Sequence, residues 1–244
     1  MTADGAPELR GSLDERAEHE RLLRLEEAYS SSPYYRKIWQ SESPASRLMA
    51  DRKWALITTL VREEGLDVES ARVLDLGVGS GQDGARFKAL GARPDRFVGL
   101  DFLELRAREA HELNPWMHTV VGDACRLPLP VRHFDLVYQS TMLSSVLQPE
   151  RRERIFREID RVLAPGGLFL SYDTRYPNPW NPYTRPLRAG GFRRAFPGWP
   201  IKVWSTTAIP QLQRALAPLS LAACRLLEGV PFLRSHLLVL ARKV

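Results

Sequence analysis

Short apolar runs alternate with helical patterns through the middle of the chain. The apolar runs predict buried strands over residues 73–76, 97–101, 117–121, 134–138 and 168–173. The stretches with a helical pattern between them are 85–90, 103–113 and 151–163. Strands that alternate with helices in this way form a parallel sheet. The pattern therefore predicts an α/β fold with a mostly parallel, doubly wound sheet.

The regions on either side of this alternation differ from it. Residues 13–29 and 47–64 have helical patterns, so we expect residues 1–66 to form a helical cap or extension before a main domain over 67–244. Residues 174–208 show no clear period and are rich in proline and aromatic residues, which is typical of a functional loop. We expect a substrate-binding insert there. The last two strands are expected over 219–227 and 237–241, as an antiparallel hairpin that completes seven strands.

The most informative stretch joins the first predicted strand to the next helix. Gly77, Gly79 and Gly81 recur at every second position, and glycine at such a turn permits positive φ and close approach of a ligand to the backbone. The following helix start offers unpaired N–H groups. Residues 79–84 also match G-x-G-x-x-G, the fingerprint of dinucleotide sites. The turn therefore predicts a ligand with an anionic group.

Two acids at this turn separate the ligand classes. A pyrophosphate favours a helix start without negative charge, yet Asp83 lies there and Asp75 lies just before the turn. An amino-acid group suits the site better, because Asp75 can attract its ammonium and the glycine amides its carboxylate. S-adenosylmethionine (SAM) carries both groups. A turn-capping role for Asp75 is the alternative.

Further acids follow the next strands. Asp101 ends the second strand, twenty positions after Gly81, where Rossmann-like folds place a carboxylate on ribose hydroxyls. Phe102 follows it and is a candidate to flank the adenine. Asp123 and Ala124 follow the third strand, and Gln139 lies at the tip of the fourth.

These features together resemble class I SAM-dependent methyltransferases. The string D-x-G-x-G-x-G at residues 75–81 resembles their first motif, and the L-x-P-G-G turn at 163–167 resembles the turn before their fifth strand. The resemblance covers residues 73–173. It implies SAM as the cofactor, with Asp123 and Ala124 at the adenine. It also implies that the cofactor site includes Asp75, Gly77, Gly79, Gly81, Asp101, Phe102, Asp123, Ala124 and Gln139. Tyr34 or Tyr35 is a candidate to lie near the methionine end, although packing is the simpler role.

The catalytic residues are harder to predict than the cofactor site. Methyl transfer requires a base only when the nucleophile is a hydroxyl or a protonated amine. Asp173 and Arg175 are the best-placed candidates, because in this fold the end of the fifth strand faces the substrate. A loop-capping role for Asp173 is an equal alternative. The tetrapeptide Asn-Pro-Pro-Tyr of enzymes that methylate base amino groups is absent after the fourth strand.

The distribution of charge along the chain narrows the chemical class of the methyl acceptor. The net charge is +6, and residues 174–227 contain several arginines and no Asp or Glu. Arginine binds phosphate or carboxylate in a bidentate manner, which favours an anionic small-molecule or saccharide acceptor, methylated on oxygen. The segment after Asp173 is similar to inserts in methyltransferases of surface-sugar and natural-product pathways. The alternatives are a solvated basic face, an RNA-modifying methyltransferase, an NAD-dependent oxidoreductase and a fold that only binds.

Composition excludes several other classes. Hydrophobic residues make up 44% of the chain and charged residues 26%, as in globular domains. Cys125 and Cys224 are far apart, and no His, Cys or carboxylate cluster has the spacing of a metal site, so we expect no metal. No apolar run suits a secretory signal or a membrane span, which predicts a cytoplasmic protein.

Overall fold

The computed structural model describes residues 13–31, 43–178 and 181–244, and its chain divides into two compact units. The first unit, Met1–Ser41, contains helix α1 (Leu13–Ser31), as the sequence predicts. Within α1, Arg21 forms an ion pair with Glu18 at 2.7 Å. Tyr34 and Tyr35 lie outside the described residues. The second unit, Glu42–Val244, contains the sheet.

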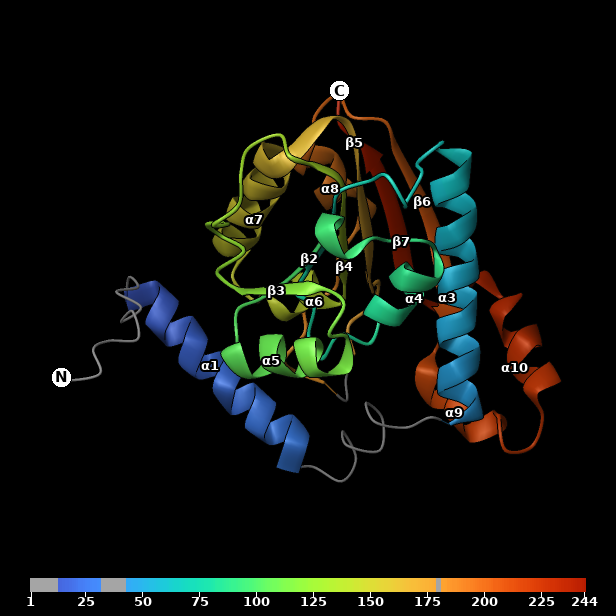
Figure 1. Ribbon diagram of the computed structural model, residues 1–244. Helices are drawn as coiled ribbons and strands as arrows, with labels where there is room; N and C mark the ends of the chain where they lie inside the picture. The colour runs from blue at the N-terminus through green and yellow to red at the C-terminus, as the bar shows by residue number, and fades with distance from the viewer. Residues whose placement is uncertain (1–12, 32–42, 179–180) are drawn as a thin grey trace. The chain divides into compact units, whose positions relative to one another are not determined.

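Seven strands form one sheet in the order β3-β2-β1-β4-β5-β7-β6 (Figure 1). Six strands run in the same direction, and β7 runs antiparallel to both of its neighbours. This confirms the predicted mostly parallel sheet with antiparallel closing strands. The strand bounds are β1 Val73–Leu76, β2 Phe97–Asp101, β3 His118–Val121, β4 Phe134–Ser140, β5 Leu163–Thr174, β6 Ile201–Ala208 and β7 Arg234–Arg242.

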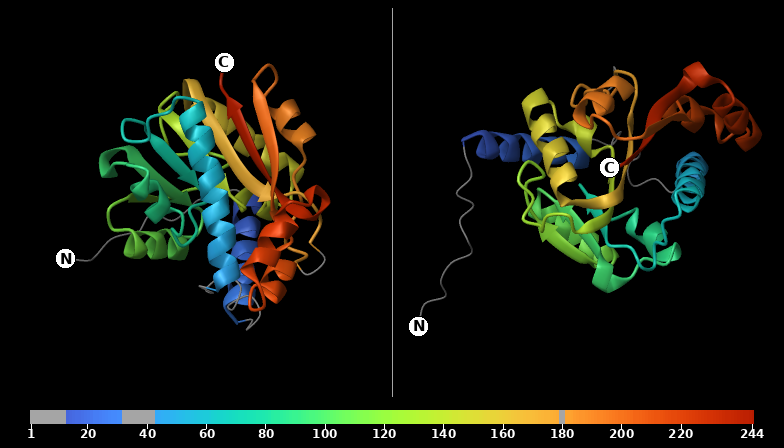
Figure 2. Two further views of the ribbon diagram at one scale, coloured as in Figure 1. Left: turned by 90° about the vertical axis from the view of Figure 1, so that its right-hand side faces the viewer. Right: turned by 90° about the horizontal axis from the view of Figure 1, so that it is seen from above.

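Helices cover both faces of the sheet, and α3 and α7 lie on opposite sides of it (Figures 1 and 2). One core cluster joins α3 to strand residues such as Tyr138 and Tyr172, and a second joins α7 and α8 to the opposite face. The helix bounds are α3 Pro44–Glu63, α4 Gly84–Ala89, α5 Glu104–Leu113, α6 Met142–Ser145, α7 Pro149–Val162, α8 Ala189–Ala195, α9 Pro210–Leu216 and α10 Leu221–Glu228. Two short 3-10 helices complete them, at Pro94–Arg96 and Pro231–Leu233.

The position of α3 differs from the expected organisation. We expected the helical extension to reach residue 66, but α3 belongs to the unit that contains the sheet. Its buried side chains, which include Trp54, Ile57 and Leu60, are part of a core cluster of that sheet. The reason is hydrophobic: an amphipathic helix buries its apolar face on the nearest complementary surface.

Two predictions at the C-terminal end of the chain are wrong. Residues 219–227, predicted as a strand, form α10, because Ser220 caps the helix by accepting a hydrogen bond from the Ala223 N–H and the segment is rich in leucine and alanine. Residues 174–208, predicted to be irregular, contain α8 and β6. The β-branched stretch of β6 is therefore the partner of β7, and the connection between them is a helical excursion over residues 209–233 rather than a tight turn.

Candidate functional site

The glycine turn lies at the carboxyl edge of the sheet, between β1 and α4. Gly77, Gly79 and Gly81 all have positive φ, at 75°, 55° and 77°. A Cβ on Gly77 would lie 2.4 Å from the Met142 Cγ, so this position has no room for a side chain. Space is open above Gly79, where a Cβ would meet no atom within 4 Å. The backbone of Gly79 is therefore accessible to a ligand, as the sequence predicts.

Asp101 links this turn to the end of β2. Its carboxylate accepts hydrogen bonds from the Gly79 N–H at 2.9 Å and the Leu103 N–H at 3.0 Å. Burial raises the pKa of Asp101, and these two hydrogen bonds partly oppose that effect. A carboxylate can accept about four hydrogen bonds, so Asp101 retains capacity for hydroxyl groups of a ligand. Phe102 follows it and is half-buried.

Asp75 is a buried acid in the middle of this edge. It lies in β1 with only 3% of its surface exposed. Within the described residues, no group donates a hydrogen bond to its carboxylate. Burial raises the pKa of Asp75 well above its usual value, the negative charges of Asp83 and Asp101 add to this, and Lys53 opposes it. Such a group favours a cationic ligand that would pair with it.

Asp123 is already paired within the protein. Its Oδ2 accepts a hydrogen bond from the Arg151 Nη2 at 2.9 Å, and its Oδ1 accepts one from the Cys125 N–H at 2.8 Å. Arg151, in α7, is itself buried. The pair fixes the loop that carries Ala124, whose surface is half-buried. The place expected to contact an adenine is thus held rigid by an arginine that the sequence analysis did not include.

A second group of polar side chains surrounds Asp83, the residue just before α4. The Lys53 Nζ lies 2.8 Å from both Asp83 carboxylate oxygens. The Trp54 Nε1 donates to the same carboxylate at 2.8 Å, and the Tyr138 hydroxyl donates at 2.6 Å. Burial opposes ionisation of Asp83, but the positive charge of Lys53 and the hydrogen bonds from Lys53, Tyr138 and Trp54 prevail and lower its pKa. The turn is thereby tied to α3 and β4.

Lys53 also faces the ends of β4 and β5. Its Nζ lies 3.4 Å from the Ser140 Oγ and 5.2 Å from the centre of the Tyr172 ring. Tyr172 in turn stacks on His236 of β7, with ring centres 4.8 Å apart and planes at 7°. Burial lowers the pKa of His236 to about 4, and Lys53 and Arg214 add to this effect. His236 is therefore neutral at pH 7.

Gln139 and Asp173 form one buried network at the ends of β4 and β5. Gln139 is fully buried and donates to Ser171 and Asp173, while its oxygen accepts from the backbone N–H groups of Met142 and Leu143. Asp173 accepts hydrogen bonds from the N–H groups of Ser144 and Thr174. Burial raises the pKa of Asp173 to about 6, although these hydrogen bonds oppose the shift. This geometry favours a positioning role for both side chains, which hold α6 in place.

Arginines gather beside this network. The Arg152 Nε is buried and has no hydrogen-bond partner in the described part of the chain. Burial lowers the pKa of Arg152, Asp173 opposes this, and the positive charge of Arg185 adds to it. The Arg185 N–H donates to the Ser144 carbonyl at 2.8 Å, and the Arg175 guanidinium lies 4.8 Å from the Tyr176 ring centre. The carboxyl edge near α6 is therefore positively charged.

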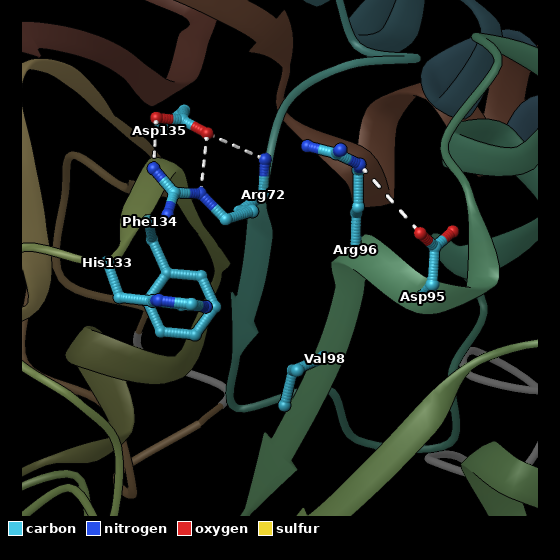
Figure 3. Close-up of a pocket in the computed structure, with 7 residues that line it drawn as sticks. All are labelled: Arg72, Asp95, Arg96, Val98, His133, Phe134 and Asp135. Atoms are coloured by element: carbon cyan, nitrogen blue, oxygen red, sulfur yellow. Dashed lines mark hydrogen bonds and ion pairs between the residues drawn. The ribbon is translucent and has the colours of Figure 1, made fainter.

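The pocket in Figure 3 lies at the opposite edge. Its lining residues, which include Arg72, Arg96 and Asp135, flank the amino ends of β1, β2 and β4. Arg72 and Asp135 form an ion pair at 3.1 Å, so these charges already have partners. In open α/β sheets, ligands bind at the carboxyl ends of the strands. We therefore place the functional site at the carboxyl edge rather than in this pocket.

The sequence predicts none of Lys53, Tyr138 and Arg151, which contact acids at this edge of the sheet. One signal was available for Lys53, because it falls on the apolar face of a helix with Ile57 and Leu60, where a charge is unusual. The described ranges contain no cluster of three or more His, Cys, Asp or Glu side chains that could bind a metal ion.

Comparisons with known proteins agree with this geometry. Residues 73–167 match the family model described as a methyltransferase domain. The chain is 40% identical over 112 residues to the fatty-acid O-methyltransferase of Mycolicibacterium smegmatis, a match that covers 45% of this chain and 39% of that protein. It is 36% identical over 107 residues to the malonyl-[acyl-carrier protein] O-methyltransferase of Marinomonas sp., covering 40% and 36%. The chain thus matches well under two-thirds of the length of these relatives.

A solved structure extends the comparison to the fold. The putative sarcosine dimethylglycine methyltransferase of Galdieria sulphuraria has a TM-score of 0.62 and 15% identity, and the match covers 86% of this chain and 97% of that one. The family match shows a methyltransferase domain over residues 73–167, and the solved structures show that the chain has the fold of SAM-dependent methyltransferases, enzymes whose cofactor is SAM. No described helix is long and apolar enough to cross a bilayer.

Proposed function

We propose that the protein transfers the methyl group of SAM to a carboxylate oxygen of a small-molecule acceptor. One observation carries the cofactor part: Asp75 is buried without a hydrogen-bond donor in the described residues, beside the accessible backbone of Gly79. A cofactor ammonium would pair with Asp75, the amides of the glycine turn would hold the cofactor carboxylate, and Asp101 would bind the ribose hydroxyls.

The residues around the acceptor end support a nucleophile that is already anionic. SAM supplies an electrophilic methyl group when it is bound, and a carboxylate can accept it without loss of a proton. A hydroxyl acceptor would need a base, but His236, with its pKa lowered to about 4, is a weak base at pH 7. Asp173 is buried, and its oxygens are occupied by backbone N–H groups. The assignment of Asp173 and Arg175 as catalytic residues remains a prediction.

The charge at this edge supports the same acceptor class. Arg152 and Arg185 repel one another there, and the buried Arg152 Nε lacks a partner among the described residues. A carboxylate bound between them would satisfy that donor and offset the repulsion. The names of the relatives are consistent with this chemistry, since a fatty-acid O-methyltransferase and a malonyl-[acyl-carrier protein] O-methyltransferase both take their names from carboxylate-bearing compounds.

The test compares acceptors that differ only at the reacting group. Production of S-adenosylhomocysteine (SAH) is measured with decanoate and decanol, and with a uronic acid and its neutral sugar. We expect turnover with at least one acid and none with its neutral counterpart. Turnover of decanol, of a neutral sugar or of RNA would contradict a carboxylate acceptor while leaving the cofactor assignment intact.

Single substitutions then locate the acceptor. Arg175→Ala or Arg185→Ala should raise the KM for the acid about tenfold or more, because a charge-assisted contact contributes about 1.5–3 kcal/mol, and should leave SAH affinity unchanged. The matched control is Arg193→Ala, which removes an exposed arginine of α8 outside this cluster. Equal KM values for all three variants and the parent would indicate a basic face that serves only solvation.

A further inference from the structure

The excursion between β6 and β7 exposes an unusual amount of apolar surface. Residues 209–233 carry five large apolar side chains that are at least 40% exposed: Leu212, Leu219, Leu221, Leu226 and Phe232. Leu226 and Phe232 are 76% and 72% exposed. On α10, the exposed positions Leu221, Ala222, Arg225 and Leu226 share one face, while Cys224 and Glu228 are buried on the other. We call the exposed side of residues 209–233 the apolar surface.

The charge on this surface has one sign. Arg225 is the only charged residue among the exposed residues of the excursion. Its single acid, Glu228, is buried and forms an ion pair with Arg52 at 2.5 Å. Arg52 itself is partly exposed beside the surface. An apolar surface fringed by positive charge and free of exposed acids is the pattern of interfacial binding to anionic lipids.

The direction of β7 places this surface next to the candidate site. Because β7 runs antiparallel to β5, its first residues lie at the carboxyl edge, where His236 pairs with Thr174. The excursion therefore starts and ends at the edge that holds Asp75 and Tyr172 rather than at the opposite one. Figure 2 shows α10 projecting at the periphery of its unit, on the outer side of α3. A surface that docks there would lie beside the entrance for an acceptor.

We propose that the apolar surface docks on a membrane that contains anionic lipids. Leu226 and Phe232 would enter the boundary between headgroups and acyl chains, and Arg225 would contact anionic headgroups. A second copy of the chain fits the surface less well. A symmetric contact would bring two Arg225 side chains together with no exposed acid of the excursion to neutralise them. The proposal does not depend on which acceptor the enzyme methylates.

Vesicle flotation tests the docking directly. The full chain is mixed with vesicles of phosphatidylcholine alone, or of phosphatidylcholine with a minor fraction of phosphatidylglycerol. We expect the parent to float with the anionic vesicles and to be released by added salt. Leu226→Ser with Phe232→Ser should reduce the bound fraction at least about tenfold, and Arg225→Glu should weaken binding to the anionic vesicles several-fold. Phe232→Trp should retain binding.

The controls keep the test independent of folding and of catalysis. Leu113→Ser with Val131→Ser removes two side chains that are each 61% exposed elsewhere, and it should float like the parent. Thermal melts and SAH binding of every variant should match the parent. The proposal is overturned if the parent binds SAH but does not float, or if the variant of Leu226 and Phe232 floats as the parent does. A lipid-free dimer that this variant abolishes would also overturn it, in favour of a second copy.

Discussion

The two halves of the carboxyl edge are built in different ways. On the side of β1 and β2, the backbone dominates: the Gly79 N–H donates to Asp101, and Asp75 is left without a donor in the described residues. Toward β4, β5 and β7, side chains satisfy one another, as where Tyr138 of β4 and Lys53 of α3 donate to Asp83 at the end of the glycine turn. Under the proposed function, the cofactor would bind to the first half and the acceptor to the second.

The difference also separates residues that affect ligand affinity from residues that affect the stability of the fold. A buried carboxylate without a partner lowers the stability of the free protein and gains a partner only from a ligand. The carboxylate of Asp83, which accepts four hydrogen bonds within the protein, contributes to the stability of the fold itself. Substitutions in the two halves should therefore act on different measurements, and the three that follow are ordered by their expected effect.

Lys53→Met should give the largest effect, on stability. Lys53 and Asp83 form a mostly buried ion pair, and removal of one partner of such a pair costs about 3–5 kcal/mol. The pKa of Asp83 is lowered, so its stabilising contribution is present above the usual carboxyl pKa and is lost only as the pH falls through the lowered value. Urea unfolding at neutral pH measures the loss.

A second pair between the same elements provides the control. Arg86 and Asp51 also connect α4 to α3 at 2.5 Å, but both side chains are exposed. Arg86→Met should therefore cost at most about 1 kcal/mol. Adding Asp83→Asn to Lys53→Met should restore part of the stability. If Lys53→Met costs no more than Arg86→Met, the described cluster is not what connects the turn to α3.

Asp75→Asn should give the next largest effect, on cofactor affinity. Loss of a buried charge-assisted contact should weaken SAH binding by about 3 kcal/mol, or more than a hundredfold. The raised pKa of Asp75 means that its ionisation reduces the stability of the free protein as the pH rises through that pKa. The ligand-free variant should therefore melt no lower than the parent at neutral pH.

Calorimetry can separate the two consequences. When the parent binds SAH at a pH below the raised pKa of Asp75, it should release a proton, seen as a dependence of the binding heat on the buffer. The Asn variant should show no such release. A variant that melts far below the parent and keeps its SAH affinity would mean that Asp75 supports the fold rather than the cofactor.

Asp101→Ala should have the smallest of the three effects. Loss of contacts to ribose hydroxyls should weaken SAH binding by about 1.5–3 kcal/mol, which is about tenfold or more, with a small change in melting temperature. Asp95→Ala is the matched control, because Asp95 lies before the other end of β2. Isothermal titration measures both variants. Equal affinity of the Asp101 variant and the parent would exclude Asp101 as the ribose-binding acid.

The parts of the fold that the sequence predicts are those with a strong local signal. Apolar runs and helix patterns between Val73 and Asp173 correspond to β1 to β5 and the helices between them. The prediction of residues 219–227 as a strand is wrong because a short apolar run fits a strand or a helix equally well, and only the cap at Ser220 separates them. The strand β6 was missed because the prolines before it suggested a loop.

In the candidate site too, some residues have a local sequence signal and others have none. The glycine turn, Asp75 and Asp101 are close in sequence to strand ends, so spacing alone predicts their position at the carboxyl edge of the sheet. Lys53 lies thirty positions before its partner Asp83, and no local pattern specifies that distance. Gln139 was expected at the cofactor because it lies at the tip of the fourth strand, but its side chain is turned into the protein toward Ser171. Side-chain direction at a strand tip depends on tertiary packing that spacing does not determine.

The buried acid in β1 has a consequence for the lifetime of the protein in a cell. A protein that is destabilised without its ligand and stabilised by ligand binding is unfolded less often when the ligand is abundant. Proteases act mainly on the unfolded population, and a change of 1–2 kcal/mol alters abundance several-fold. If Asp75 binds the cofactor ammonium as proposed, it would couple the steady-state amount of this protein to the supply of the methyl donor, and a cell depleted of SAM would also clear the enzyme that consumes it.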